Sequence, residues 1–176
     1  MTGLVRRVNL WPDPLFKTLK PSNKYGGTIE RGTNEAVWRA TEESNGCGWD
    51  FANLEKNTDM VFRCFLWVSA TNAIALRVYG YGQSGIQLAS FTPNSSRNTP
   101  VLRFNTGAYE KIRIEFSAVN GGNTNIGEPN LELAYTFDES LPYFDYSMMP
   151  DPRGGGGIRP SLLAARAVRS FWGLAA

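Results

Sequence analysis

Histidine is absent from this 176-residue sequence. Its absence removes the side chain that most often acts as a general base near neutral pH, and it excludes nucleophiles activated in serine–histidine or cysteine–histidine pairs. The sequence also lacks the glycine-rich nucleotide-binding motifs, the Cys-x-x-Cys motif and the metalloprotease motif. An enzyme with this sequence would therefore have to work with carboxylates.

Cysteine is scarce, and Cys47 and Cys64 are the complete set. Two cysteines allow at most one disulfide, and they make neither a disulfide scaffold nor a four-ligand zinc site. We expect free thiols. Cys64 lies in an apolar run, where a thiol usually acts as a small buried hydrophobic group.

Long apolar runs are also missing. No apolar stretch of signal-peptide length follows Arg6 and Arg7, and the sequence has no run of about 18 apolar residues, the length that crosses a membrane. We therefore expect a soluble protein that is made in a bacterial cytoplasm.

Acidic residues are missing from the last part of the chain. The whole sequence has a formal net charge of +2, and residues 152–176 contain no Asp or Glu. Their cations are Arg153, Arg159, Arg166 and Arg169. This asymmetry separates a near-neutral body from a basic tail.

Hydrophobic residues make up 42% of the chain and aromatic residues 12%, which is enough for the core of one domain. Period-two alternation predicts strands. In the stretch 109–116, Ile112, Ile114 and Phe116 face one way, whereas Lys111, Arg113 and Glu115 face the other.

The run 60–68 is apolar on both faces apart from Arg63, as expected for a central strand. Its predicted inward residues are Phe62, Cys64, Leu66 and Val68. We predict a hairpin at Thr71-Asn72 that leads to a strand with Ile74, Leu76 and Val78 on one face and Arg77, Tyr79 and Tyr81 on the other.

Shorter strands are predicted over 88–91 and 101–104, with loops over 93–100 and 121–125. A last strand is predicted where Leu131, Leu133 and Tyr135 alternate with Glu132 and Ala134. Short strands without a long helix before residue 160 predict an all-β antiparallel sandwich over residues 1–150.

Residues 151–176 are predicted to form a separate tail. The four glycines from Gly154 to Gly157 read as a flexible tether, followed by a helix with Pro160 near its start and Gly173 near its end. A helix of about 12 residues is marginal alone in water. It would either stay frayed or order on the sandwich or on a neighbouring subunit. The residues predicted for a subunit contact are Arg159, Leu162, Leu163, Arg166, Val168, Arg169, Phe171 and Trp172.

Two short segments frame the sandwich: NLWPDPLF, from Asn9 to Phe16, and LPYFD, from Leu141 to Asp145, with Gly48-Trp49 between them. In their order and spacing they resemble the carbohydrate-binding-module-like jelly rolls of bacteriophage minor tail proteins, especially in phages of actinobacteria. The resemblance covers roughly residues 8–146. It implies a jelly-roll fold and a structural role for Trp49.

The same resemblance bears on cofactors. Many such modules hold a structural calcium ion, whose usual N-terminal ligand is an acid directly after Asn-Pro-x-Phe. Here Lys17 takes that position, so we expect no cofactor, although Asp13, Glu128 and Asp138 could contribute oxygens.

Sugar binding would need flat aromatic faces beside hydrogen-bonding side chains. The predicted candidates are Trp67, Arg77, Tyr79, Tyr81 and Gln83, with Trp38 as a second option. These aromatic residues could equally be packing groups or subunit contacts.

A glycosidase would need paired acids. The candidates are Glu42, Glu43, Asp50, Asp59, Glu115, Asp138 and Glu139.

The sequence therefore predicts a non-enzymatic structural protein of a phage virion, a minor tail protein at the tail tip or baseplate that is repeated as a symmetric homo-oligomer among other virion subunits. We expect neither nucleic acid nor membrane as a partner. A receptor-binding module for a host cell-wall glycan and a capsid decoration protein are the alternatives.

Overall fold

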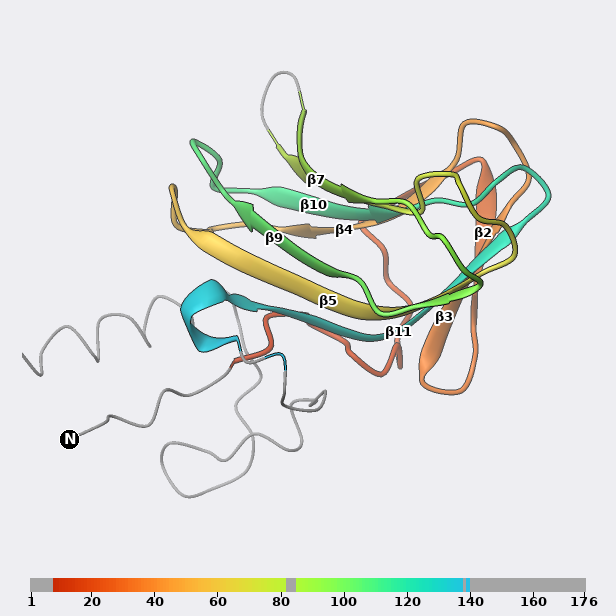
Figure 1. The fold of residues 1–176 in the computed structure, drawn as a ribbon, viewed down its shortest axis with the longest axis horizontal. Coiled ribbons are helices and arrows are strands. Elements are labelled where there is room, and N and C mark those ends of the chain that lie inside the picture. The colour runs from red at the N-terminus through yellow and green to blue at the C-terminus, as the bar shows by residue number, and fades with distance from the viewer. Residues whose placement is uncertain (1–7, 82–84, 138, 140–176) are drawn as a thin grey trace, which may run out of the picture.

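The computed structural model describes residues 8–81, 85–137 and 139. In these residues the strands form two antiparallel sheets that face each other (Figure 1). Figure 1 shows β7, β10 and β4 in one layer and β5, β11 and β3 in the other. The predicted all-β antiparallel sandwich is confirmed. None of the described residues belongs to a helix long and apolar enough to span a membrane.

The first sheet, sheet A, has the strand order β1-β4-β10-β6-β7. Its strands are β1 (Asn23–Tyr25), β4 (Gly46–Phe51), β10 (Ile112–Phe116), β6 (Leu76–Gly80) and β7 (Ile86–Phe91). The second, sheet B, has the order β2-β3-β11-β5-β8, and β9 also pairs with β5. Its strands are β2 (Gly27–Arg31), β3 (Glu35–Ala40), β11 (Asn123–Leu133), β5 (Asp59–Val68), β8 (Arg97–Asn98) and β9 (Val101–Asn105), and a short 3₁₀ turn, η1 (Ala134–Thr136), follows β11.

The inward faces of the two sheets form one hydrophobic core. The predicted inward residues of β5 and β10 are all buried: Phe62, Cys64, Leu66, Val68, Ile112, Ile114 and Phe116. Trp49 also lies in the core, as predicted.

Cys47 and Cys64 are buried free thiols, and burial raises the pKa of the Cys47 thiol to about 12.

Trp11 occupies the centre of this core, although it precedes the first strand. Its ring lies 5.2 Å from the ring of Trp49 and 5.3 Å from that of Phe51, both in sheet A. On the other side it lies 5.5 Å from the ring of Phe62 in sheet B. The segment before the sandwich therefore supplies the aromatic group that both sheets pack against.

Asn9 fixes this segment to β11. Its Oδ1 accepts hydrogen bonds from the backbone N–H groups of Trp11 (3.0 Å) and Leu131 (3.1 Å), and its Nδ2 donates to the carbonyl of Pro129 (3.0 Å). The strand is irregular there, with a register shift between Gly127 and Asn130. The pairing of β11 with β3 stops at Gly127, and the Asn9 side chain binds backbone groups of β11 beyond that point.

The predicted hairpin at Thr71-Asn72 is wrong. The strands on either side of it belong to different sheets, because β5 pairs with β11 whereas β6 pairs with β10. The connection crosses from sheet B to sheet A, and it is held to the end of β7 by hydrogen bonds such as Ala75 N–H to the carbonyl of Phe91 (3.1 Å).

The last strand also differs from its prediction. It begins at Asn123, within the predicted loop, and ends at Leu133. Glu132 is fully buried, whereas Tyr135 is exposed. The Glu132 carboxylate accepts hydrogen bonds from Asn130 Nδ2 (2.8 Å) and Thr136 Oγ1 (3.1 Å), so a charged group that the alternation placed outward is satisfied inside.

Several predictions lie outside the described residues. These are Gln83, Asp138, the closing segment 141–145, the domain boundary at 150, and the tail over 151–176 with its tether, helix and subunit-contact residues.

We predict that Trp11→Ala lowers the free energy of unfolding by about 3–5 kcal/mol, because it leaves a cavity between the sheets. Trp11→Phe should cost less: it keeps a ring and removes an indole N–H that is buried without a hydrogen-bond partner among the described residues. Urea unfolding measures both. Tyr135→Ala, at an exposed aromatic residue, is the control and should stay within about 0.5 kcal/mol of wild type. Equal losses for Trp11→Ala and the control would contradict the central role of Trp11.

Candidate functional site

The outer side of sheet A gathers polar and aromatic side chains from five strands. Direct cross-strand partners share a face of a sheet. Arg113 pairs with Asp50 and Tyr79, and Tyr79 also pairs with Gln87. We call this surface the polar face; it comprises Tyr25, Asp50, Arg77, Tyr79, Tyr81, Gln87, Lys111, Arg113 and Glu115.

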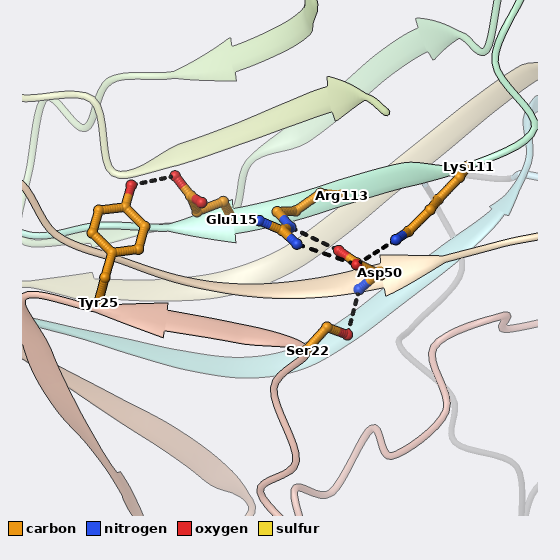
Figure 2. Close-up of polar contacts among 6 residues, drawn as sticks. All are labelled: Ser22, Tyr25, Asp50, Lys111, Arg113 and Glu115. Carbon is orange, nitrogen blue, oxygen red and sulfur yellow. Dashed lines mark hydrogen bonds and ion pairs between the residues drawn. The ribbon is translucent and has the colours of Figure 1, made fainter. Parts of the chain in front are cut away.

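Asp50 is the centre of a charge cluster on this face (Figure 2). The Arg113 guanidinium binds it with two contacts, Nε to Oδ1 at 2.7 Å and Nη2 to Oδ2 at 3.2 Å. Lys111 Nζ lies 2.9 Å from Oδ2. The hydroxyl of Ser22 accepts a hydrogen bond from the Asp50 backbone N–H (2.9 Å). Cations from the start of β10 thus converge on one carboxylate of β4.

This cluster shifts the titration of its members. Burial of Asp50 alone would raise its pKa, but the hydrogen bonds and charges of Arg113 and Lys111 outweigh burial and lower the pKa below its usual value. The hydrogen bond to Asp50 correspondingly raises the pKa of Arg113. The Asp50–Arg113 pair therefore stays ionised and fixed in place near neutral pH.

A second polar pair lies toward the edge strand. The Tyr25 hydroxyl donates to Glu115 Oε1 at 3.1 Å, and the two side chains face each other in Figure 2. Glu115 is only 5% exposed. Burial raises the pKa of its carboxyl, with the Tyr25 hydrogen bond acting against that rise. Burial also raises the pKa of Tyr25.

Two glycines on β4 make this arrangement possible. A Cβ at Gly46 would lie 2.9 Å from the Glu115 carboxyl carbon and 2.9 Å from the Tyr25 hydroxyl. A Cβ at Gly48 would lie 2.9 Å from Cδ of Arg113. The missing side chains therefore leave room for Glu115, Tyr25 and Arg113 to lie flat along the sheet.

Tyr81 is the most exposed ring of the polar face, with 45% of its surface open to solvent, and Tyr25 follows at 41%. Its backbone N–H donates to the carbonyl of Lys111 (2.8 Å), which fixes it beside β10. The Lys111 ammonium lies 4.2 Å from the centre of the ring, and the Arg113 guanidinium carbon 4.7 Å. These cation–π contacts hold the ring in one position.

The structure places the residues predicted for sugar binding in three different environments. Arg77, Tyr79 and Tyr81 share the polar face, as their alternation predicted. Trp67 does not adjoin them, because it belongs to β5 in sheet B. Trp38 is 0% exposed and donates its indole N–H to Asn45 (3.0 Å), so it is a core residue and the prediction that it contacts a sugar is wrong.

The sequence reasoning did not assign Tyr25, Gln87, Lys111 and Arg113 to this site. The outward direction of Lys111 and Arg113 was predicted, but their position beside Tyr79 and Tyr81 depends on the pairing of β10 with β6. These strands are far apart in the sequence, and no local pattern signals their pairing.

Three of the candidate acids for hydrolysis are held by other side chains. Asp50 is bound by two cations, and Glu115 is buried against Tyr25. Asp59 belongs to sheet B, where it accepts a hydrogen bond from Asn105 on the neighbouring strand β9 (2.7 Å). Glu42 and Glu43 are exposed in the connection before β4.

Of the three residues that could contribute oxygens to a calcium ion, Asp13 is bound within its own loop, and Asp138 lies outside the described residues. The Asp13 carboxylate caps its own loop: it accepts hydrogen bonds from the backbone N–H groups of Lys17 (2.9 Å) and Thr18 (2.7 Å) and from the Thr18 hydroxyl (2.8 Å). Over 8–81, 85–137 and 139, no cluster of three metal-ligating Cys, Asp or Glu side chains occurs.

Comparison with known proteins identifies the fold. The sequence matches no protein-family model and no curated protein. Among solved structures, a mutant of a carbohydrate binding module of family 29 matches at TM-score 0.53 and 10% identity, over 77% of this chain and 98% of that chain. The N-terminal cellulose-binding domain from Cellulomonas fimi β-1,4-glucanase C matches at TM-score 0.51 and 14% identity, over 62% of this chain and 86% of that chain.

A third match is the enzymatically active domain of tailspike protein 4 from bacteriophage CBA120, with TM-score 0.51 and 12% identity. It covers 72% of this chain but 21% of the tailspike chain. At these identities the matches speak to the fold. The described part of the chain shares its β-sandwich fold with these solved structures.

We predict that Asp50→Asn lowers the free energy of unfolding at pH 7 by about 1–3 kcal/mol, because Arg113 and Lys111 lose a charged acceptor. Since the folded-state pKa of Asp50 lies below its unfolded value, its contribution is complete above the unfolded pKa and is lost as pH falls through the folded pKa. The difference between variant and wild type should therefore shrink in acid.

Urea unfolding between about pH 2 and 7 tests this, since model aspartates titrate near pH 4. The control is Asp59→Asn, a change at an exposed carboxylate. It should cost less than about 0.5 kcal/mol. A difference for Asp50→Asn that is the same at every pH would contradict the role of the ion pair.

Proposed function

We propose that this chain is a non-catalytic carbohydrate-binding protein that holds a glycan on the polar face of sheet A. The observation that carries the proposal is the exposed ring of Tyr81, fixed by Lys111 and Arg113. Tyr79 lies two residues earlier in the chain, on β6, and Gln87 is its partner across the sheet, on β7. Aromatic rings stack on the apolar C–H faces of sugars, and neighbouring charged and amide side chains bind the hydroxyls.

The rigidity of the face favours this function. The Arg113 guanidinium is held by two contacts to Asp50, and the Tyr25 hydroxyl by Glu115. Side chains that are already ordered lose little conformational entropy when a ligand binds. A long glycan, which makes weak contacts at each sugar, gains most from such a surface.

The fold supports the same proposal. Two of its structural neighbours are described as a carbohydrate binding module and a cellulose-binding domain. The described acids do not favour hydrolysis, since Asp50 is neutralised by two cations and Glu115 is buried. Binding without bond cleavage is therefore the role we assign to this face.

The setting that we propose for this binding protein is a phage virion, as a minor tail protein that forms a symmetric homo-oligomer with other virion subunits. The opening segment, Asn9 to Phe16, supports this setting through its resemblance to such proteins. The occurrence of the fold in a phage tailspike is compatible with it. In that setting the polar face would meet a glycan of the host cell wall.

We predict that Tyr81→Ala weakens glycan binding about tenfold, because one stacked ring contributes on the order of 1–1.5 kcal/mol. The full chain would be screened on an array of plant and bacterial polysaccharides, and the affinity for the best ligand measured by calorimetry. The control is Tyr135→Ala, which removes an exposed ring next to sheet B. Absence of binding across the array, or equal losses for the two variants, would overturn the proposed site.

The virion setting has its own test. We expect a cryo-electron microscopy reconstruction of the phage particle to show the sandwich at the tail tip or baseplate, in symmetric copies with the polar face open to solvent. Location on the head would favour capsid decoration instead. A polar face covered by a neighbouring subunit would favour a purely structural role.

A further inference from the structure

The charges on the polar face are not equally open to solvent. Lys111 has 37% of its side chain exposed, whereas Asp50, its partner, has 15%. The Arg113 side chain is 13% exposed, about as little as that of Asp50. A ligand that approaches this cluster therefore meets an ammonium group before it meets the carboxylate.

In the buried part of the cluster, the positive and negative charges already balance. Arg113 and Asp50 make a bidentate pair, and such a pair cancels one positive and one negative charge with good geometry. Lys111 contacts the same carboxylate. One carboxylate shared by two cations leaves an excess positive charge on the more exposed of them.

The other acid of the face, Glu115, is the cross-strand partner of Arg77, so it can compensate one further cation and one positive charge remains in excess. Glu115 is almost completely covered, and one of its oxygens accepts the Tyr25 hydroxyl. Arg77 adds a further cation, and its Nη1 donates to the neutral hydroxyl of Ser117 (3.2 Å). Among the residues that the structure describes, the ion pairs do not include Arg77. The outer strand β7 contributes only uncharged side chains, such as Gln87 and Ser90.

We infer that the ligand of the polar face is an acidic polysaccharide, whose sugars carry carboxylate or phosphate groups. This inference rests on the proposed function and names its substrate class. The cations available to a ligand are Lys111, whose side chain is 37% exposed, and the half-buried Arg77. Both lie beside the aromatic residues that would stack on the sugar.

The position of Lys111 makes the inference specific. Its ammonium lies 4.2 Å from the centre of the Tyr81 ring, the most exposed ring of the face. Because the ammonium lies over a face of the ring, a sugar would stack on the face that the cations leave open, and its substituents would extend past the rim of the ring toward the flexible Lys111 side chain. A carboxylate or phosphate at the rim can then form a charge-assisted hydrogen bond, which is stronger than one to a neutral hydroxyl.

The test uses the full chain and two matched pairs of polymers: polygalacturonate with its carboxyl-reduced form, and phosphomannan with its dephosphorylated form. Binding is measured by calorimetry at low and high salt. We expect at least one acidic polymer to bind about tenfold or more tightly than its neutral partner, and its affinity to fall as salt screens the charges. The pair that shows the preference identifies carboxylate or phosphate as the recognised group.

Variants separate the local effect from the overall charge. Lys111→Gln should reduce binding of the preferred acidic polymer about tenfold, and Lys111→Arg should restore most of it. The control is Arg39→Gln, which makes the same change in net charge at an exposed position of sheet B. It should change the affinity less than twofold, and thermal melting checks that each variant is folded.

The outcomes distinguish the inference from the function beneath it. If a neutral polymer binds as tightly as its acidic partner, the ligand is not specifically an acidic polysaccharide. The same conclusion follows if a neutral polysaccharide on the array binds as tightly as the acidic ones. In either case the proposal that this face binds a glycan stands. Equal losses for Lys111→Gln and Arg39→Gln would reduce the preference to overall charge and also overturn the inference. If no glycan binds at all, the proposed function and the inference both fail.

Discussion

The insertion of Trp11 between the two sheets is the contact on which the rest of the fold depends. Its ring contacts Trp49 and Phe51 on one side and Phe62 on the other, so a single side chain fixes the spacing of the layers. It does so although its indole N–H is buried without a partner among the described residues. The dispersion and hydrophobic gain of a large buried ring outweighs the cost of that one unpaired donor, which is about 1–3 kcal/mol.

The packing of this core determines which side chains point outward on the polar face. Trp49 and Phe51 point inward toward Trp11, and the residues between and beside them on β4, Gly48 and Asp50, must then point outward. The same alternation in β10 turns Arg113 and Glu115 outward over β4. A change of register at β4 would bury Asp50 and expose two aromatic rings, so core packing and the charge cluster specify the same pairing.

Much of the fold could be predicted from local patterns, whereas the site could be predicted only in part. Alternation identified the inward residues of β5 and β10 because its period is a property of each strand alone. The same signal was present around Trp38, where Ala36 and Ala40 share its buried face, and it would have placed that ring in the core. The neighbours of Tyr79 and Tyr81 could not be found this way. They depend on the pairing of β6 with β10, and of β10 with β4, across long stretches of chain.

The hydrogen bonds of Asn9 join residues that are about as distant in the sequence as this fold allows. The partner of its Nδ2 lies 120 residues further along the chain, and the backbone N–H that binds its Oδ1 lies 122 residues away. During synthesis the hydrogen bonds between Asn9 and β11 therefore cannot form until β11 has left the ribosome. Folds dominated by such non-local contacts have high contact order and fold slowly, so we expect the attachment of this segment to β11 to come late in folding.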